Sequence, residues 1–167
     1  MKKITIFLLL SVGLIGSTYA QEGFAAKAGF NIVSIDVDTG GFFDSSDSEL
    51  GLFFGGGYNF EISEEIDIEP SLLFSIVDDL TSLYIPVMAK YNISEKFNVQ
   101  AGPQINYLLE DLPDGEFGLD FAFGGAYNID SNWFLEARYG IQISRGGDFG
   151  DLVDINTFTV GGGYRFD

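Results

Sequence analysis

The sequence predicts an all-β protein, an eight-stranded antiparallel up-and-down transmembrane β-barrel. Three observations lead to this prediction: a hairpin unit that repeats, side chains that alternate along the strands, and more large apolar residues than a small barrel can enclose. Each strand is long enough for the roughly 9–11 residues that a tilted strand needs to cross hydrocarbon. The eight expected strands cover residues 24–33, 50–62, 66–76, 82–93, 97–109, 116–129, 133–143 and 155–166.

The repeat is marked by a tyrosine near the end of four similar segments, Tyr58, Tyr91, Tyr127 and Tyr164. Each of the first three is followed by a short polar stretch, which predicts a tight turn and the start of the next strand. Long connections separate one such unit from the next. A unit with one short and one long connection is a two-stranded hairpin, so the chain is predicted to form a single meandering sheet.

Alternation gives each predicted strand one apolar face and one face of small and polar residues. Phe97 and Val99, for example, alternate with Asn98 and Gln100. A closed barrel of eight strands has room inside for only about a dozen side chains. The apolar face must therefore point outward, which is stable only in lipid. A soluble β-sandwich could bury that face, but its other face would then be rich in charged residues. Here the other face is rich in glycine, which makes room in a narrow lumen.

Residues 1–20 are predicted to be a secretory signal peptide. Two lysines precede a short apolar run over residues 4–15, and small residues follow it up to Ala20. The apolar run is shorter than the ~20 residues that a membrane-spanning helix needs. Export with cleavage after Ala20 is therefore expected, and residues 21–167 are predicted to be the β-barrel domain.

The composition excludes several classes of function. The chain has no histidine and no cysteine, so Ser-His-Asp hydrolysis and imidazole or thiolate metal sites are excluded. The net charge of −17 argues against nucleic acid as a partner. Carboxylate pairs alone can in principle perform acid–base chemistry. We nevertheless predict no catalytic residues, no cofactor and no enzyme activity.

Prolines interrupt three of the predicted strands. Pro70, Pro86 and Pro103 each remove one donor from the ladder of backbone hydrogen bonds. Because a closed barrel has no free edge to accommodate them, β-bulges are expected at these positions.

Aromatic residues gather beside the predicted short turns. Such a belt is typical of a membrane interface. The predicted aromatic girdle consists of Tyr58, Tyr91, Phe97, Tyr127, Trp133 and Tyr164.

Charged residues also fall on the predicted inner face. They are Lys27, Glu61, Asp67, Glu69, Lys90, Asp120, Glu136, Arg138 and Arg165. Alignment of the repeats places Lys27, Glu69, Gln100 and Glu136 at one level. This set could form an ion path or a gate. A structural plug of ion pairs is favoured, because buried charges must be paired and small barrels are nearly filled by their own side chains.

The long connections are acidic, with Arg145 as their one basic residue. A solvated, repulsive surface is the simplest interpretation. Divalent cation binding is the alternative, since Ca²⁺ prefers clustered carboxylates. No metal site is predicted, because the candidates lack the glycine and glutamate of an EF-hand loop. These weak candidates are Asp36, Asp38, Asp148, Asp151 and Asp154. A surface ligand or another envelope protein would bind through these same loops.

Four segments carry more specific motifs: residues 83–91, 97–104, 136–140 and 163–166. The most specific parts are Pro86 followed by Lys90-Tyr91, and the stretch Ala101-Gly102-Pro103-Gln104. These motifs resemble the outer-membrane β-barrel domain proteins of Bacteroidota that are often called PorT-like. The resemblance covers essentially the whole mature chain. It implies an integral barrel in contact with outer-membrane lipid, and no shared catalytic residues.

The predicted function is that of a small integral outer-membrane barrel with a structural or surface-interaction role and a plugged lumen. The alternative is an accessory role in transport or in protein secretion across the outer membrane, which the PorT-like resemblance implies. An enzyme that acts on lipid is disfavoured because the chain contains no histidine.

Overall fold

The computed structural model describes residues 23–37, 45–78, 80–109, 117–146 and 153–166. The predicted signal peptide, residues 1–20, lies outside these ranges. Within them, no helix is long and apolar enough to cross a membrane.

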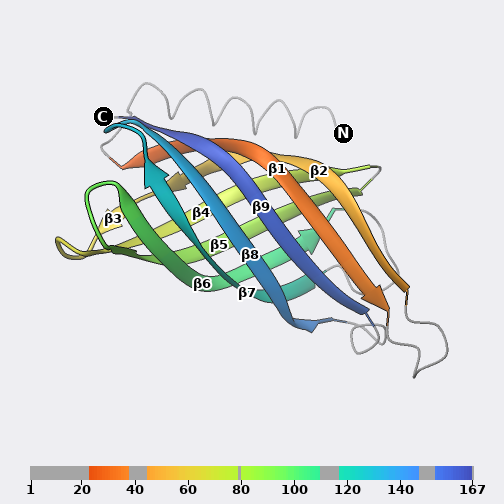
Figure 1. The fold of residues 1–167 in the computed structure, drawn as a ribbon. Helices are drawn as coiled ribbons and strands as arrows, with labels where there is room; N and C mark the ends of the chain where they lie inside the picture. Colours follow the sequence, from red (N-terminus) through yellow and green to blue (C-terminus); the bar gives the residue numbers. More distant parts are fainter. Residues whose placement is uncertain (1–22, 38–44, 79, 110–116, 147–152, 167) are drawn as a thin grey trace, which may run out of the picture.

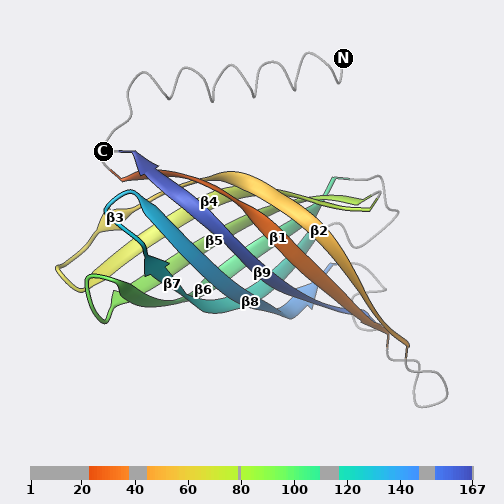
Figure 2. The ribbon, with the colours of Figure 1, turned by 45° about the horizontal axis from the view of Figure 1, so that its top comes forward.

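The described residues form one antiparallel sheet that closes into a barrel (Figures 1 and 2). Strand β9 pairs with β1 to complete the closure. Strands β2 and β3 both pair with β4 in one continuous register, so they are two parts of a single strand. The barrel is therefore eight-stranded, as predicted. Its strands are β1 (Phe24–Val37), β2 (Ser45–Tyr58), β3 (Phe60–Glu61), β4 (Ile66–Val77), β5 (Leu80–Asn92), β6 (Phe97–Leu108), β7 (Phe117–Asn128), β8 (Trp133–Arg145) and β9 (Val153–Phe166).

The prolines interrupt the ladder without shifting its register, so the predicted bulges at these positions are wrong. Pro70, Pro86 and Pro103 each pair with one neighbouring strand and lack a pair on the other side. A missing N–H removes a bond, but it does not require an inserted residue. Among the described pairings, the one register shift lies between Leu119 and Asp120, where β7 meets β8.

The predicted facing of the strands is confirmed. On β6, the polar side chains Asn98 and Gln100 are buried, whereas Phe97 and Val99 are exposed. The same alternation holds along β7 and β8, where Trp133 points outward. The apolar face thus covers the outside of the barrel, and polar side chains fill the inside.

The first hairpin is longer than predicted. Strand β1 continues to Val37 and β2 begins at Ser45, so Asp36 and Glu49 belong to strands rather than to a loop. The segment Ser45–Glu49 carries no large apolar side chain, so hydrophobic alternation cannot reveal it as a strand.

The two ends of the barrel differ in their connections. The short turns 62–65, 93–96 and 129–132 lie at the end where β1 begins and β9 finishes (Figure 1). The strand ends that the longer connections join lie at the opposite end, together with the end of β4. The turn after β4 is only residues 78–79, and Asp78 has a φ of 50°. Aspartate tolerates this left-handed conformation, which suits a tight hairpin.

Glycine allows close strand approach at Gly102, which faces the lumen from β6. A Cβ atom at this position would lie 2.0 Å from the carbonyl oxygen of Val87 on β5. Because that oxygen belongs to the backbone, relief requires movement of the strand. We expect Gly102→Ala to lower the free energy of unfolding by about 1–3 kcal/mol. Urea unfolding in phospholipid vesicles, followed by the fluorescence of Trp133, measures this loss.

Gly162→Ala is the matched control, because Gly162 lies on the outer face of β9. Its nearest contact to an added Cβ would be 3.3 Å, to the carbonyl oxygen of Phe134. The control should therefore lose clearly less stability. Equal losses for the two variants would contradict the close approach at Gly102.

Candidate functional site

Five charged side chains meet inside the barrel, in the half nearer the short turns. Lys27 and Lys90 each donate a hydrogen bond to one carboxylate oxygen of Glu69. Lys27 Nζ also donates to Glu136 Oε2 at 2.9 Å. Arg138 Nη2 lies 3.4 Å from Glu136 Oε1. These contacts link β5, β4, β1 and β8 across the lumen. We call Lys27, Glu69, Lys90, Glu136 and Arg138 the ion-pair cluster, and each is at most 4 % exposed.

An aromatic ring lies beside the cluster. Phe134 points inward from β8 and is fully buried. The Nζ atoms of Lys27 and Lys90 lie 5.5 and 5.9 Å from its ring centroid, and Arg165 Cζ lies at 4.5 Å. These distances permit cation–π attraction. The cross-strand partner Gly163 leaves room for the ring, since a Cβ there would lie 2.2 Å from Phe134 Cζ.

Two other predicted lumen charges lie towards the short turns. Asp67 is buried, and its Oδ2 accepts a hydrogen bond from Asn92 Nδ2 at 3.1 Å. Arg165 is half-buried and donates from Nη2 to Asn128 Oδ1 at 2.9 Å. Neither side chain joins the ion-pair cluster in the described residues.

Glu61 does not lie in the lumen network where the sequence analysis placed it. It is exposed at the mouth of the barrel. The physical reason is that β3 ends at Glu61, so its side chain reaches solvent beside the turn 62–65.

A second polar group lies nearer the long connections. Asp120 is fully buried and accepts a hydrogen bond from Gln104 Nε2 at 3.0 Å. Gln142 Oε1 accepts from Arg145 Nε at 2.9 Å and from the backbone N–H of Ile155 at 3.2 Å. Arg145 is therefore part of the interior rather than of a loop. Strand β8 runs to Arg145, two residues beyond its predicted end, after the register shift against β7.

Of the amides on β6, the sequence analysis gave a role only to Gln100, which it placed at one level with Lys27, Glu69 and Glu136. The side chains of Asn98, Gln100, Gln104 and Asn106 are all buried inside the barrel. Neither amide atom of Gln100 has a hydrogen-bond partner in the described part of the chain. The alternation along β6 already placed these residues inside. The alternation gave no reason to treat these amides differently from the charged side chains around them.

The predicted girdle residues lie at the short-turn end. Tyr58 and Tyr164 are half-buried because their rings pack on neighbours: Tyr58 on Phe60 with centroids 4.6 Å apart, and Tyr164 on Trp133 at 5.1 Å. The others are exposed on the outside of the barrel, and they are Tyr91, Phe97, Tyr127 and Trp133.

The weak metal candidates are only partly described. Asp38, Asp148 and Asp151 lie outside the described residues. Asp36 and Asp154 lie opposite each other in the register of β1 and β9. In the described ranges, no group of three or more potential ligands is placed to hold a metal ion.

Residues 5–166 match the family described as the outer membrane protein beta-barrel domain. The chain belongs to this family. No curated protein matches the chain. As a member of the outer membrane protein beta-barrel domain family, the barrel places its outward apolar face against lipid.

Solved structures of small outer-membrane barrels are similar to this family member. Neisserial surface protein A is 16% identical, with a TM-score of 0.60 over 86% of this chain and 97% of that one. Ail of Yersinia pestis is 17% identical, with a TM-score of 0.50 over 87% and 100%. The N-terminal barrel domain of OprF from Pseudomonas aeruginosa is 15% identical, with a TM-score of 0.51 over 87% and 98%. At these identities the similarity concerns the fold alone.

Proposed function

We propose that this outer-membrane barrel has a structural or surface-interaction role, and that the ion-pair cluster plugs its lumen. The observation that carries the proposal is the chain of contacts from Lys90 through Glu69, Lys27 and Glu136 to Arg138. It crosses the lumen, and its members are almost completely buried. The proposal includes no enzymatic activity, since the chain has no histidine or cysteine.

The plug follows from the size of the barrel. An eight-stranded barrel has an interior just wide enough for its own side chains. A permeating ion would have to separate buried charges from their partners, and uncompensated buried charge costs several kcal/mol per ion. The paired charges across the lumen therefore close the path.

Planar bilayers test the plug. The purified wild-type barrel is expected to insert without steady, well-resolved single-channel steps. A gel shift that depends on heating shows that the protein used in the bilayers is a folded barrel. The absence of channel current is then not caused by unfolded protein. Steady channel steps from the wild type would refute the plug and indicate a pore.

The acidic long connections are proposed to bind a neutral or cationic partner rather than an anionic one. Ail has been solved in complex with the heparin analogue sucrose octasulfate. The present chain has a net charge of −17 and acidic long connections, so it should repel a sulfated polyanion. Exchange of these connections for uncharged ones should abolish the interaction that the protein makes at the cell surface. A variant that keeps this interaction would count against the surface role.

The second candidate is an accessory role in transport or protein secretion. It is supported by the PorT-like motif in which Pro86 precedes Lys90 and Tyr91. In the structure, Lys90 belongs to the ion-pair cluster. Deletion of the gene should then impair the export of other proteins, an effect that a purely structural barrel would not produce.

A further inference from the structure

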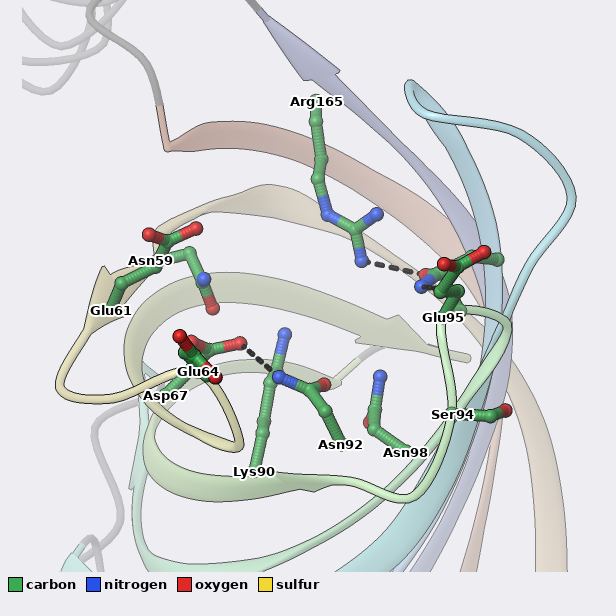
Figure 3. A pocket seen from close by; sticks show the side chains of 11 residues that line it. Asn59, Glu61, Glu64, Asp67, Lys90, Asn92, Ser94, Glu95, Asn98 and Arg165 are labelled. Carbon is green, nitrogen blue, oxygen red and sulfur yellow. Dashed lines mark hydrogen bonds between the residues drawn. The ribbon is translucent and has the colours of Figure 1, made fainter.

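A polar cavity of about 450 Å³ opens at the short-turn end of the barrel (Figure 3). We call it the vestibule. Its inner part is lined by Lys90, Asn98 and Arg165, and its entrance by Glu61, Glu64 and Glu95. Its volume falls in the range of roughly 300–1,000 Å³ that is usual for small-molecule sites.

The inner part of the vestibule carries excess positive charge. The Lys90 side chain is 2 % exposed and extends from the wall into the ion-pair cluster, in which three cations face two carboxylates. Arg165 adds a further cation, and it donates its hydrogen bond to Asn128 from Nη2. Asp67 is the one additional buried acid on this wall. The buried and half-buried groups therefore leave one positive charge in excess.

The entrance has the opposite sign. Glu61, Glu64 and Glu95 are exposed around it, on β3 and on the turns 62–65 and 93–96. A simple anion would be repelled at this entrance, and a simple cation would be repelled further in. The reversal of charge favours a ligand that carries both signs at separate ends.

A buried amide in the wall supplies an independent indication of a ligand. Asn98 is 2 % exposed and lines the vestibule, and its Oδ1 has no hydrogen-bond partner in the described part of the chain. Buried polar atoms are normally paired. Asn59 and Asn92 line the same cavity (Figure 3), as does Asn128. Asparagine amides both donate and accept, as the backbone of a peptide requires.

We propose that the vestibule binds a short zwitterionic peptide. Its carboxylate lies towards Lys90 and Arg165, its ammonium groups lie towards the entrance glutamates, and its amide bonds with the asparagines. This site shares Lys90 with the lumen plug, but it needs only the mouth of the barrel and no passage through it.

Calorimetric titration of the full barrel in detergent micelles tests the proposal with the dipeptide Lys-Ala. The C-terminally amidated dipeptide is the comparison, since it lacks the carboxylate. We expect Lys-Ala to bind. The amidated dipeptide should bind at least about ten-fold more weakly, which corresponds to one lost charge-assisted hydrogen bond. Equal binding of the two dipeptides, or no binding of Lys-Ala at millimolar concentration, would overturn the proposal.

Variants locate the site. Arg165→Gln should weaken Lys-Ala binding about ten-fold, because a charged hydrogen-bond donor is lost. Arg145→Gln is the control: it removes the same charge at the end of β8 beside the long connections, and Arg145 does not line the vestibule. A heat-dependent gel shift confirms that both variants are folded. Equal weakening by the two variants would show a general charge effect and reject the site.

The entrance is tested separately. Glu64→Gln should weaken the binding of Lys-Ala but not that of N-acetylalanine, which has a carboxylate and no ammonium. Equal effects on the two probes would contradict the proposed orientation of the peptide.

Discussion

Glu69→Ala is expected to lower the free energy of unfolding by about 3–5 kcal/mol, because it leaves buried cations without their partner. Glu69 is 1 % exposed and accepts hydrogen bonds from both Lys27 and Lys90. After its removal, Lys27 keeps its bond to Glu136, whereas Lys90 loses the one ion pair that it makes in the described residues. Urea unfolding in phospholipid vesicles measures the loss.

Two further variants separate charge burial from the loss of packing. Glu95→Ala removes the same charge from an exposed turn and should change stability by less than about 0.5 kcal/mol. The triple variant Lys27→Met, Glu69→Met and Lys90→Met replaces three of the five cluster charges by apolar side chains and leaves Glu136 paired with Arg138. It should recover much of the stability, since such replacements are often neutral or stabilising. A triple variant as unstable as Glu69→Ala would assign the loss to packing instead.

Strand number and facing could be predicted from the sequence because lipid imposes a simple rule. Wherever an outward residue meets hydrocarbon it must be apolar, so alternation marks the strand directly. Phe97–Leu108 is an example, predicted to within one residue. The rule fails beyond the hydrocarbon: Ser45–Glu49 continues β2 with polar side chains, and no sequence pattern distinguishes it from a loop.

The pairing inside the lumen was only partly predictable. Alignment of the repeats placed Lys27, Glu69, Gln100 and Glu136 at one level, because equivalent positions in similar hairpins reach similar heights. Lys27 does contact Glu69 and Glu136, whereas the Gln100 amide has no hydrogen-bond partner in the described residues. The alignment could not supply the partner of Lys90. Strand register places Asp67 opposite Lys90, yet Lys90 Nζ bonds Glu69. A long side chain extends along the lumen, and its final partner depends on the tilt and stagger of the closed barrel.

The prolines show a related limit. In the sequence, each proline shows only that one backbone N–H donor is missing. Either a β-bulge or a skipped pair in the ladder can accommodate the missing donor. In the structure every one of the three keeps a pair on one side, so the skipped pair is sufficient. The choice between the two depends on both neighbouring strands, which a single strand sequence does not contain.

Leu72→Arg is expected to lower the free energy of unfolding in lipid vesicles by about 2–4 kcal/mol, the cost of a charge near the bilayer midplane. Leu72 lies in the middle of β4, points outward and is 41 % exposed. Leu135→Arg is the matched control on β8, only two residues from Trp133 of the predicted girdle. Because the cost falls to about 0–1 kcal/mol near the interface, this control should lose much less stability. A soluble surface would give small and equal losses at both positions. A larger loss of stability for Leu72→Arg than for Leu135→Arg therefore tests two assignments together, the lipid-facing side of the sheet and the height of the girdle.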